Sequence, residues 1–103
     1  FFALADSGNN LKEPFSDYPV IVADRALFEN VQCTRVVPFS TIGGEGLLQA
    51  FKPDLVLVST ADKNYELKNI YVALSDNVKR GEYRGIINPQ TILLSENEVR
   101  YAE

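Results

Sequence analysis

The triplet Asp6-Ser7-Gly8 is the part of the sequence whose residue types are best suited to chemistry. It directly follows the apolar residues 3–5, which predict a strand that anchors the loop in the core. Asp6 supplies a carboxylate, Ser7 a hydroxyl able to bond to a facing loop, and Gly8 a position where backbones approach closely. This combination favours peptide-bond hydrolysis by paired carboxylates. The simpler interpretation is an Asx-turn after a strand.

Hydrolysis of this kind needs two carboxylates that share one proton, because two negative charges about 3 Å apart cannot both stay ionised. The ionised member takes a proton from water, and the protonated member donates to the scissile carbonyl oxygen. Only Asp6 is followed by a hydroxyl residue and a glycine; the other aspartates are Asp17, Asp24, Asp54, Asp62 and Asp76. One chain therefore supplies half of the dyad, which predicts a homodimer with two Asp6 residues on its two-fold axis.

Composition excludes several other classes of function. Histidine is absent from the 103 residues, which removes the base of a Ser-His-Asp triad and the commonest metal ligand. The single Cys33 allows no internal disulfide, and we expect no metal and no cofactor. A net charge of −4 with scattered Lys and Arg argues against a nucleic-acid partner. The longest apolar run, residues 1–5, is far shorter than the roughly 20 residues of a membrane span.

Short apolar runs between turn residues predict a single, mainly β domain over residues 1–103, with about seven strands. The expected strands are 1–6, 20–23, 31–39, 55–58, 70–74 and 85–87, with a hairpin at 42–48 and a turn at 61–64. Residues 25–30 have room for one helical turn, and Pro38 is expected to stop or bend its strand. Asn88-Pro89 predicts a short helix over 90–94. Residues 96–103 fit either a terminal strand or a frayed tail.

Two further segments suit the chemistry of the Asp6 loop. The stretch Ile42-Gly43-Gly44-Glu45-Gly46 has the glycine content of a flap that closes over an extended peptide, although an ordinary surface hairpin has the same pattern. The pair Ile86-Ile87 with Asn88 predicts a strand that runs beneath the Asp6 loop and supports it, although a core strand without this role would have the same sequence pattern.

The order of the triplet, the glycine hairpin and the apolar pair resembles that of the retropepsins, half-size aspartic peptidases that act as homodimers. A closer resemblance is to the sporulation sigma-E factor-processing peptidases of endospore-forming bacteria. It is carried by Leu4-Ala5-Asp6-Ser7-Gly8-Asn9-Asn10-Leu11, Pro19-Val20-Ile21, Val37-Pro38-Phe39, Gly46-Leu47-Leu48 and Ala50-Phe51-Lys52-Pro53-Asp54. Two positions depart from the retropepsins: Asn88 replaces a glycine after the apolar pair, and Asn9 replaces a small alanine after Gly8.

The resemblance implies a retropepsin-like small closed β-barrel, half of a pepsin-like fold, with one short C-terminal helix. It implies an aspartic endopeptidase that removes the pro-sequence of the sigma factor, with Asp6 as the catalytic residue. The expected partners are that precursor protein, a second copy of the chain, and a signal protein that activates the enzyme through a membrane region. The chain would then be the cytoplasm-facing soluble part of a longer protein in the membrane of the sporulation septum.

The main alternative is a non-catalytic β-domain that binds a peptide or protein partner, with Asp6 only capping a turn. A domain that stays monomeric at high concentration, even with its membrane region restored, favours this alternative. Hydrolysis by Ser7 or by a lysine ranks below both, because no histidine is present to activate the serine and only Lys12 lies near it in sequence.

Overall fold

The computed structural model describes residues 1–93, and the expected strand or tail at 96–103 lies outside them. Within these residues, the chain forms the strands β1 (Phe2–Ala5), β2 (Val20–Asp24), β3 (Arg35–Thr41), β4 (Gly44–Phe51), β5 (Val56–Ser59), β6 (Asn64–Leu67), β7 (Tyr71–Ser75) and β8 (Tyr83–Ile87). A 3-10 turn, η1, covers Arg25–Leu27, and a short helix covers 89–93. The mainly β expectation is confirmed. No helix in residues 1–93 is long and apolar enough to cross a membrane.

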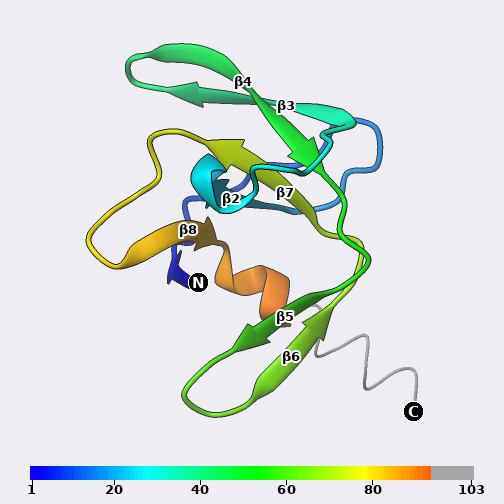
Figure 1. Ribbon diagram of the computed structural model, residues 1–103, viewed down its shortest axis with the longest axis vertical. Coiled ribbons are helices and arrows are strands. Elements are labelled where there is room, and N and C mark those ends of the chain that lie inside the picture. The colour runs from blue at the N-terminus through cyan, green and yellow to red at the C-terminus, as the bar shows by residue number, and fades with distance from the viewer. Residues whose placement is uncertain (94–103) are drawn as a thin grey trace.

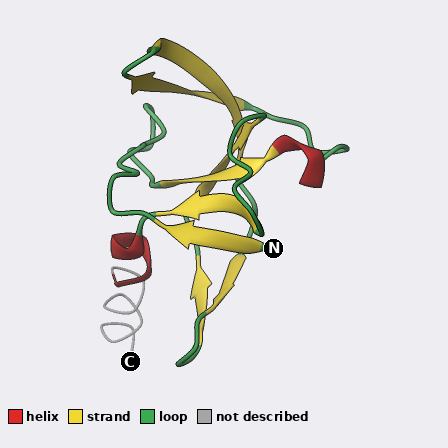
Figure 2. Ribbon diagram, turned by 90° about the vertical axis from the view of Figure 1, so that its left-hand side faces the viewer, coloured by secondary structure: helices red, strands yellow, loops and turns green. Residues whose placement is uncertain are grey.

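Six of the strands form one sheet in the order β1-β8-β2-β7-β4-β3, and β5 pairs with β6 in a separate sheet. The pairs β1–β8 and β2–β7 are parallel, and the other neighbouring pairs are antiparallel. The β3–β4 and β5–β6 hairpins lie at opposite ends of the long axis (Figure 1). Figure 2 shows the same separation from the side. The described strands leave β1 and β3 as sheet edges, so the expected closed barrel stays a prediction.

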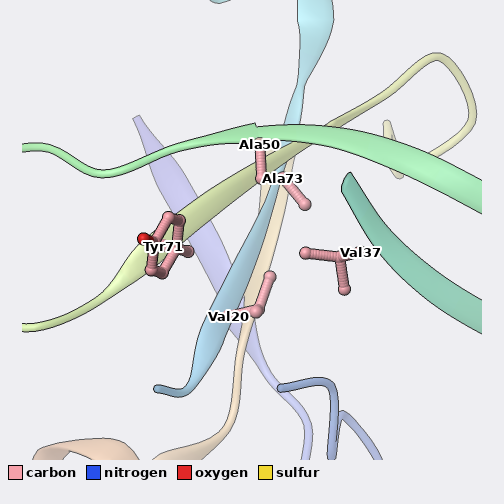
Figure 3. Packing of buried hydrophobic residues seen from close by; sticks show 5 residues of the cluster. All are labelled: Val20, Val37, Ala50, Tyr71 and Ala73. Atoms are coloured by element: carbon pink, nitrogen blue, oxygen red, sulfur yellow. The ribbon is translucent and has the colours of Figure 1, made fainter. Parts of the chain in front are cut away.

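The core is built around β2 and β7, which lie in the middle of the six-stranded sheet. All residues of β2 and the first four of β7 are buried. Strands covered on both faces appear in a sequence as continuous apolar runs, which is why β2 was predictable. The alternation within residues 70–74 predicted a strand with one face on the core, whereas the structure buries both faces of β7. Figure 3 shows the main cluster, in which side chains from β2, β3, β4 and β7 meet: Val20, Val37, Ala50, Tyr71 and Ala73.

Strand β6 was not expected; it begins at Asn64, the last residue of the predicted turn at 61–64. Only Tyr65 and Leu67 turn toward the core, and two apolar residues are too few to establish a period of two. Of the two outcomes expected at Pro38, a stop or a bend, the stop was wrong, since β3 continues through Pro38 to Thr41. An edge strand has one side without ladder bonds, so a missing amide there is tolerated.

The glycine hairpin and the C-terminal helix are close to their predicted positions. The β3–β4 connection is the two residues Ile42 and Gly43, with Thr41 opposite Gly44, so that Gly44 to Gly46 belong to β4. Gly44 has a φ of +133°, which residues with a Cβ rarely adopt. The helix begins at Pro89, one residue before the predicted start, and Asn88 caps it by accepting a 2.9 Å hydrogen bond from the Gln90 amide.

Candidate active site

The Asp6 loop begins where β1 and β8 end side by side. The two strands run parallel with Ala5 opposite Ile87, and the Asp6 amide donates to the Ile87 carbonyl at 2.9 Å. The loop therefore starts directly from the end of a hydrogen-bonded strand pair. The structure brings the Asp6 loop, through Asp6 and Asn9, into contact with residues 86–88, about 80 positions away in the sequence.

Within the loop, the Asp6 carboxylate is exposed and oriented by its own backbone. Its Oδ1 accepts a 2.8 Å hydrogen bond from the Gly8 amide, and its carbonyl accepts one of 3.1 Å from the Asn9 amide. A Cβ at Gly8 would lie 3.1 Å from that Oδ1, so glycine leaves room for the carboxylate. The Asx-turn of the simpler interpretation is present, and it also fixes the direction in which the acid points. Ser7 lies exposed beside it.

Asn9 attaches the loop to the sheet. Its Nδ2 donates to the Val20 carbonyl at 3.1 Å and to the Ile86 carbonyl at 3.5 Å. Its Oδ1 accepts from the Leu11 amide at 3.4 Å. A half-buried amide needs partners for both of its ends, and here the donor end bonds to two different strands, β2 and β8, while the acceptor end bonds to the loop itself. Sequence reasoning recognised Asn9 only as a departure from a family pattern, because its partners are distant in the chain.

The predicted flap faces the segment that follows the Asp6 loop. A groove of about 530 Å³ lies between that segment and the β3–β4 hairpin, lined by Leu11, Pro38, Phe39, Ser40, Glu45, Gly46 and Leu47. The Phe39 ring packs over Gly46, where a Cβ would be 2.5 Å from the ring Cζ. Asp6 does not line this groove, and Ile42 at the hairpin tip is fully exposed. The flap role of the hairpin stays a prediction.

Glu13 shapes the loop between the Asp6 loop and β2. Its side chain is fully buried and accepts hydrogen bonds from the Ser16 amide and hydroxyl, both at 2.8 Å, and from the Phe15 amide at 3.2 Å. Burial alone raises the pKa of this carboxyl, but these bonds and the Arg35 charge together bring the pKa below its ordinary value. Sequence reasoning missed Glu13, because an isolated glutamate is normally a surface residue.

Comparison with known proteins decides the family. The profile of the family described as sporulation factor SpoIIGA matches residues 30–91, more than half of the chain. The chain belongs to the SpoIIGA family. A probable sporulation sigma-E factor-processing peptidase of Clostridium acetobutylicum is 39% identical over 80 residues, which cover 73% of this chain. No solved structure matches the chain.

These matches confirm the resemblance to the sporulation sigma-E factor-processing peptidases. The part of this SpoIIGA-family chain that the family model matches, residues 30–91, contains the glycine hairpin, β8 and Asn88, whereas the Asp6 loop precedes it. The chain spans 30% of the length of the Clostridium relative. The case for Asp6 therefore depends on its motif and on the geometry of its loop.

Proposed function

We propose that this SpoIIGA-family chain is the protease domain of a sigma-E factor-processing peptidase, an aspartic endopeptidase with one Asp6 from each of two copies. The observation that carries the proposal is the exposed Asp6 carboxylate, held by the Gly8 amide where the paired β1 and β8 end. An acid that is exposed and already oriented can meet its copy without rearrangement of the fold. Membership of the family and the name of the Clostridium relative support the peptidase activity.

The chemistry requires one ionised and one protonated Asp6 around a shared water. The ionised carboxylate takes a proton from the water as it attacks the scissile carbonyl, and the other carboxyl donates to the carbonyl oxygen. Ser7 bonds across to the facing loop, and Gly8 lets the two loops approach. The substrate lies extended as an added strand beneath the hairpin Ile42–Gly46, whose closure excludes water. A retropepsin-like barrel over residues 1–103 is the fold in which we place this site.

The substrate in this proposal is the sigma-E precursor, since the relative is named for processing that factor. Its pro-sequence is the segment removed. A signal protein that acts through a membrane region of the full-length enzyme is the proposed activator, and the protease domain faces the cytoplasm at the sporulation septum.

The first test removes the acid with the smallest change of shape. The Asp6→Asn substitution in the full-length protein is expected to lower removal of the pro-sequence by at least about 100-fold, because an amide neither takes nor gives the proton. Electrophoresis of the precursor and its product over time measures the cleavage. Asp62→Asn, at an exposed turn, is the matched control and is expected to cleave at the wild-type rate. A folded Asp6→Asn protein with wild-type cleavage contradicts the aspartic mechanism.

A non-catalytic binding domain remains the second candidate, and the Asx-turn favours it because Asp6 already has a structural partner in Gly8. This candidate predicts that the protein binds the precursor without cleaving it and stays monomeric at high concentration. Sedimentation of the full-length protein in detergent, together with the cleavage assay, separates the two candidates.

A further inference from the structure

Asn88 joins the Asp6 loop to the C-terminal helix with a single side chain. Its Nδ2 donates to the Asn9 carbonyl at 2.9 Å and to the Asn10 Oδ1 at 3.3 Å. On the other side, its Oδ1 accepts from the Gln90 amide at 2.9 Å. The donor end of the amide thus contacts the loop and the acceptor end contacts the helix, and Asn88 itself is half-buried between them.

The helix alone does not require asparagine at this position. Serine and aspartate cap helices about as well, because capping needs only an acceptor for an amide of the first turn. Contact with the Asn9 carbonyl needs a donor as well, and an amide is a short side chain that carries both groups. Glycine, the retropepsin residue at this place, provides neither group. The residue type at 88 therefore matches the double contact seen here.

The contact reaches Asp6 through one intervening residue. Asn88 holds the Asn9 carbonyl, and the Asn9 amide in turn donates to the Asp6 carbonyl at 3.1 Å. A cavity of about 50 Å³ borders this contact and is lined in part by Asn9, Asn88 and Thr91. Loss of the Asn88 donor would leave the loop free space on that side.

We propose that Asn88 is a positioning residue for catalysis, which holds the Asp6 loop at the place where two copies bring their acids together. The inference rests on the proposed function. Two carboxylates that share a proton must stay about 3 Å apart, so a small displacement of each loop separates them. Misplacement of reacting groups by about 1 Å can lower a rate by about 100-fold. Loss of the Asn88 contact is expected to lower kcat rather than to raise KM, because the proposed binding of substrate along the hairpin does not involve Asn88.

The experiment compares Asn88→Ser with wild type in the full-length protein, using the sigma-E precursor as substrate. Serine keeps an acceptor for the Gln90 amide and is too short to replace the donor to Asn9. We expect kcat to fall about tenfold or more, with KM within about twofold and an unchanged thermal midpoint. Asn77→Ser is the matched control, since Asn77 is exposed in the β7–β8 connection and should leave kcat unchanged.

A second measurement follows the loop itself. In Asn88→Ser, hydrogen exchange at the Asn9 amide is expected to become faster than in wild type, because the turn around Asp6 is released. The inference about Asn88 is overturned if a folded Asn88→Ser protein has the wild-type kcat, or if only its KM changes. In either case the proposed function still holds, provided that cleavage depends on Asp6. Cleavage that does not depend on Asp6 overturns both.

Discussion

Two carboxylates near the start of the chain have opposite surroundings, and the surroundings decide what each can do. Asp6 is exposed and has one hydrogen bond from the Gly8 amide, so its carboxylate stays accessible to water and to a second copy. Glu13 is fully buried, and its oxygens are occupied by Ser16 and Phe15. Glu13 is therefore a structural acid that shapes the loop after Asp6, and it has no access to a substrate.

Glu13 makes stability depend on pH. Its pKa is below the ordinary 4.5 in the folded chain, so the folded state releases the proton more readily than the unfolded state does. The stabilisation is present above about pH 4.5 and is lost as the pH falls through the folded pKa. Glu13→Gln is expected to be less stable at neutral pH and to lose less further stability than wild type on acidification. Urea unfolding between about pH 7 and about pH 3 measures the difference.

Asp24 provides the background for that experiment. The hydrogen bond from the Ala26 amide is the main cause of its lowered pKa, and Arg84 lowers the pKa further. Protonation of Asp24 at low pH therefore also destabilises the fold. Both proteins retain Asp24, so only the difference between their curves reports on Glu13. Parallel curves for wild type and Glu13→Gln would assign the acid sensitivity to other groups.

Among the elements, β8 determines where the Asp6 loop lies, because it is hydrogen-bonded to β1 on one side and to β2 on the other. Gly85 permits the approach to β2: a Cβ there would be 2.9 Å from the Val22 carbonyl oxygen and 2.6 Å from the Phe1 ring. A backbone oxygen within a sheet cannot move aside without displacing its strand. The close contact between β8 and β2 therefore depends on this glycine.

Gly85→Ala is expected to lower the free energy of unfolding by about 1–3 kcal/mol, the usual cost of an overpacked site. Gly46→Ala is the matched control, because its Cβ meets only the far end of the Phe39 ring, which can rotate away. We expect a loss below about 1 kcal/mol there. Denaturant unfolding measures both, and equal losses in the two variants would contradict the importance of the backbone contact.

At the scale of the whole molecule, a chain with one Asp-Ser-Gly triplet depends on a second copy for the proposed reaction. Residues 1–93 contain the Asp6 loop, the strand beside it and the hairpin, so each copy would contribute half of a symmetric site. In the proposed mechanism, the second copy's Asp6 is the catalytic group that a single chain lacks. Activity is therefore expected to be a property of the assembly.

Mixing of subunits tests this requirement. Adding an equal amount of Asp6→Asn protein to a fixed amount of wild type is expected to lower cleavage to about half, because freely exchanging subunits form mixed dimers with one acid. The same amount of an unrelated protein should have no effect. Unchanged cleavage under conditions where differently tagged wild-type and Asp6→Asn subunits co-purify as mixed dimers would show that a single Asp6 suffices.

Much of the fold and part of the site could be predicted from local sequence. Residues 20–23 were recognisable as a strand because burial on both faces leaves a continuous apolar run, and residues 70–74 because of their alternation, although that alternation did not indicate burial of both faces. The Asn88 cap and the glycine hairpin were predictable because a helix start and a tight turn depend on a few consecutive residues. Strand β6 and the buried Glu13 were not, since a four-residue alternation and a lone acid carry little local signal.

The sequence alone determined which residues are candidates for the chemistry: it has one Asp-Ser-Gly triplet and a glycine hairpin, and it has no histidine. Only the tertiary structure decided what holds that triplet, because the partners of the loop lie on other strands. The Asn88 side chain and the Asn9 carbonyl are 79 positions apart and come within 2.9 Å only because β1 and β8 run parallel. Local residue preferences act over a few positions along the chain, whereas strand pairing is set by packing of the whole sheet.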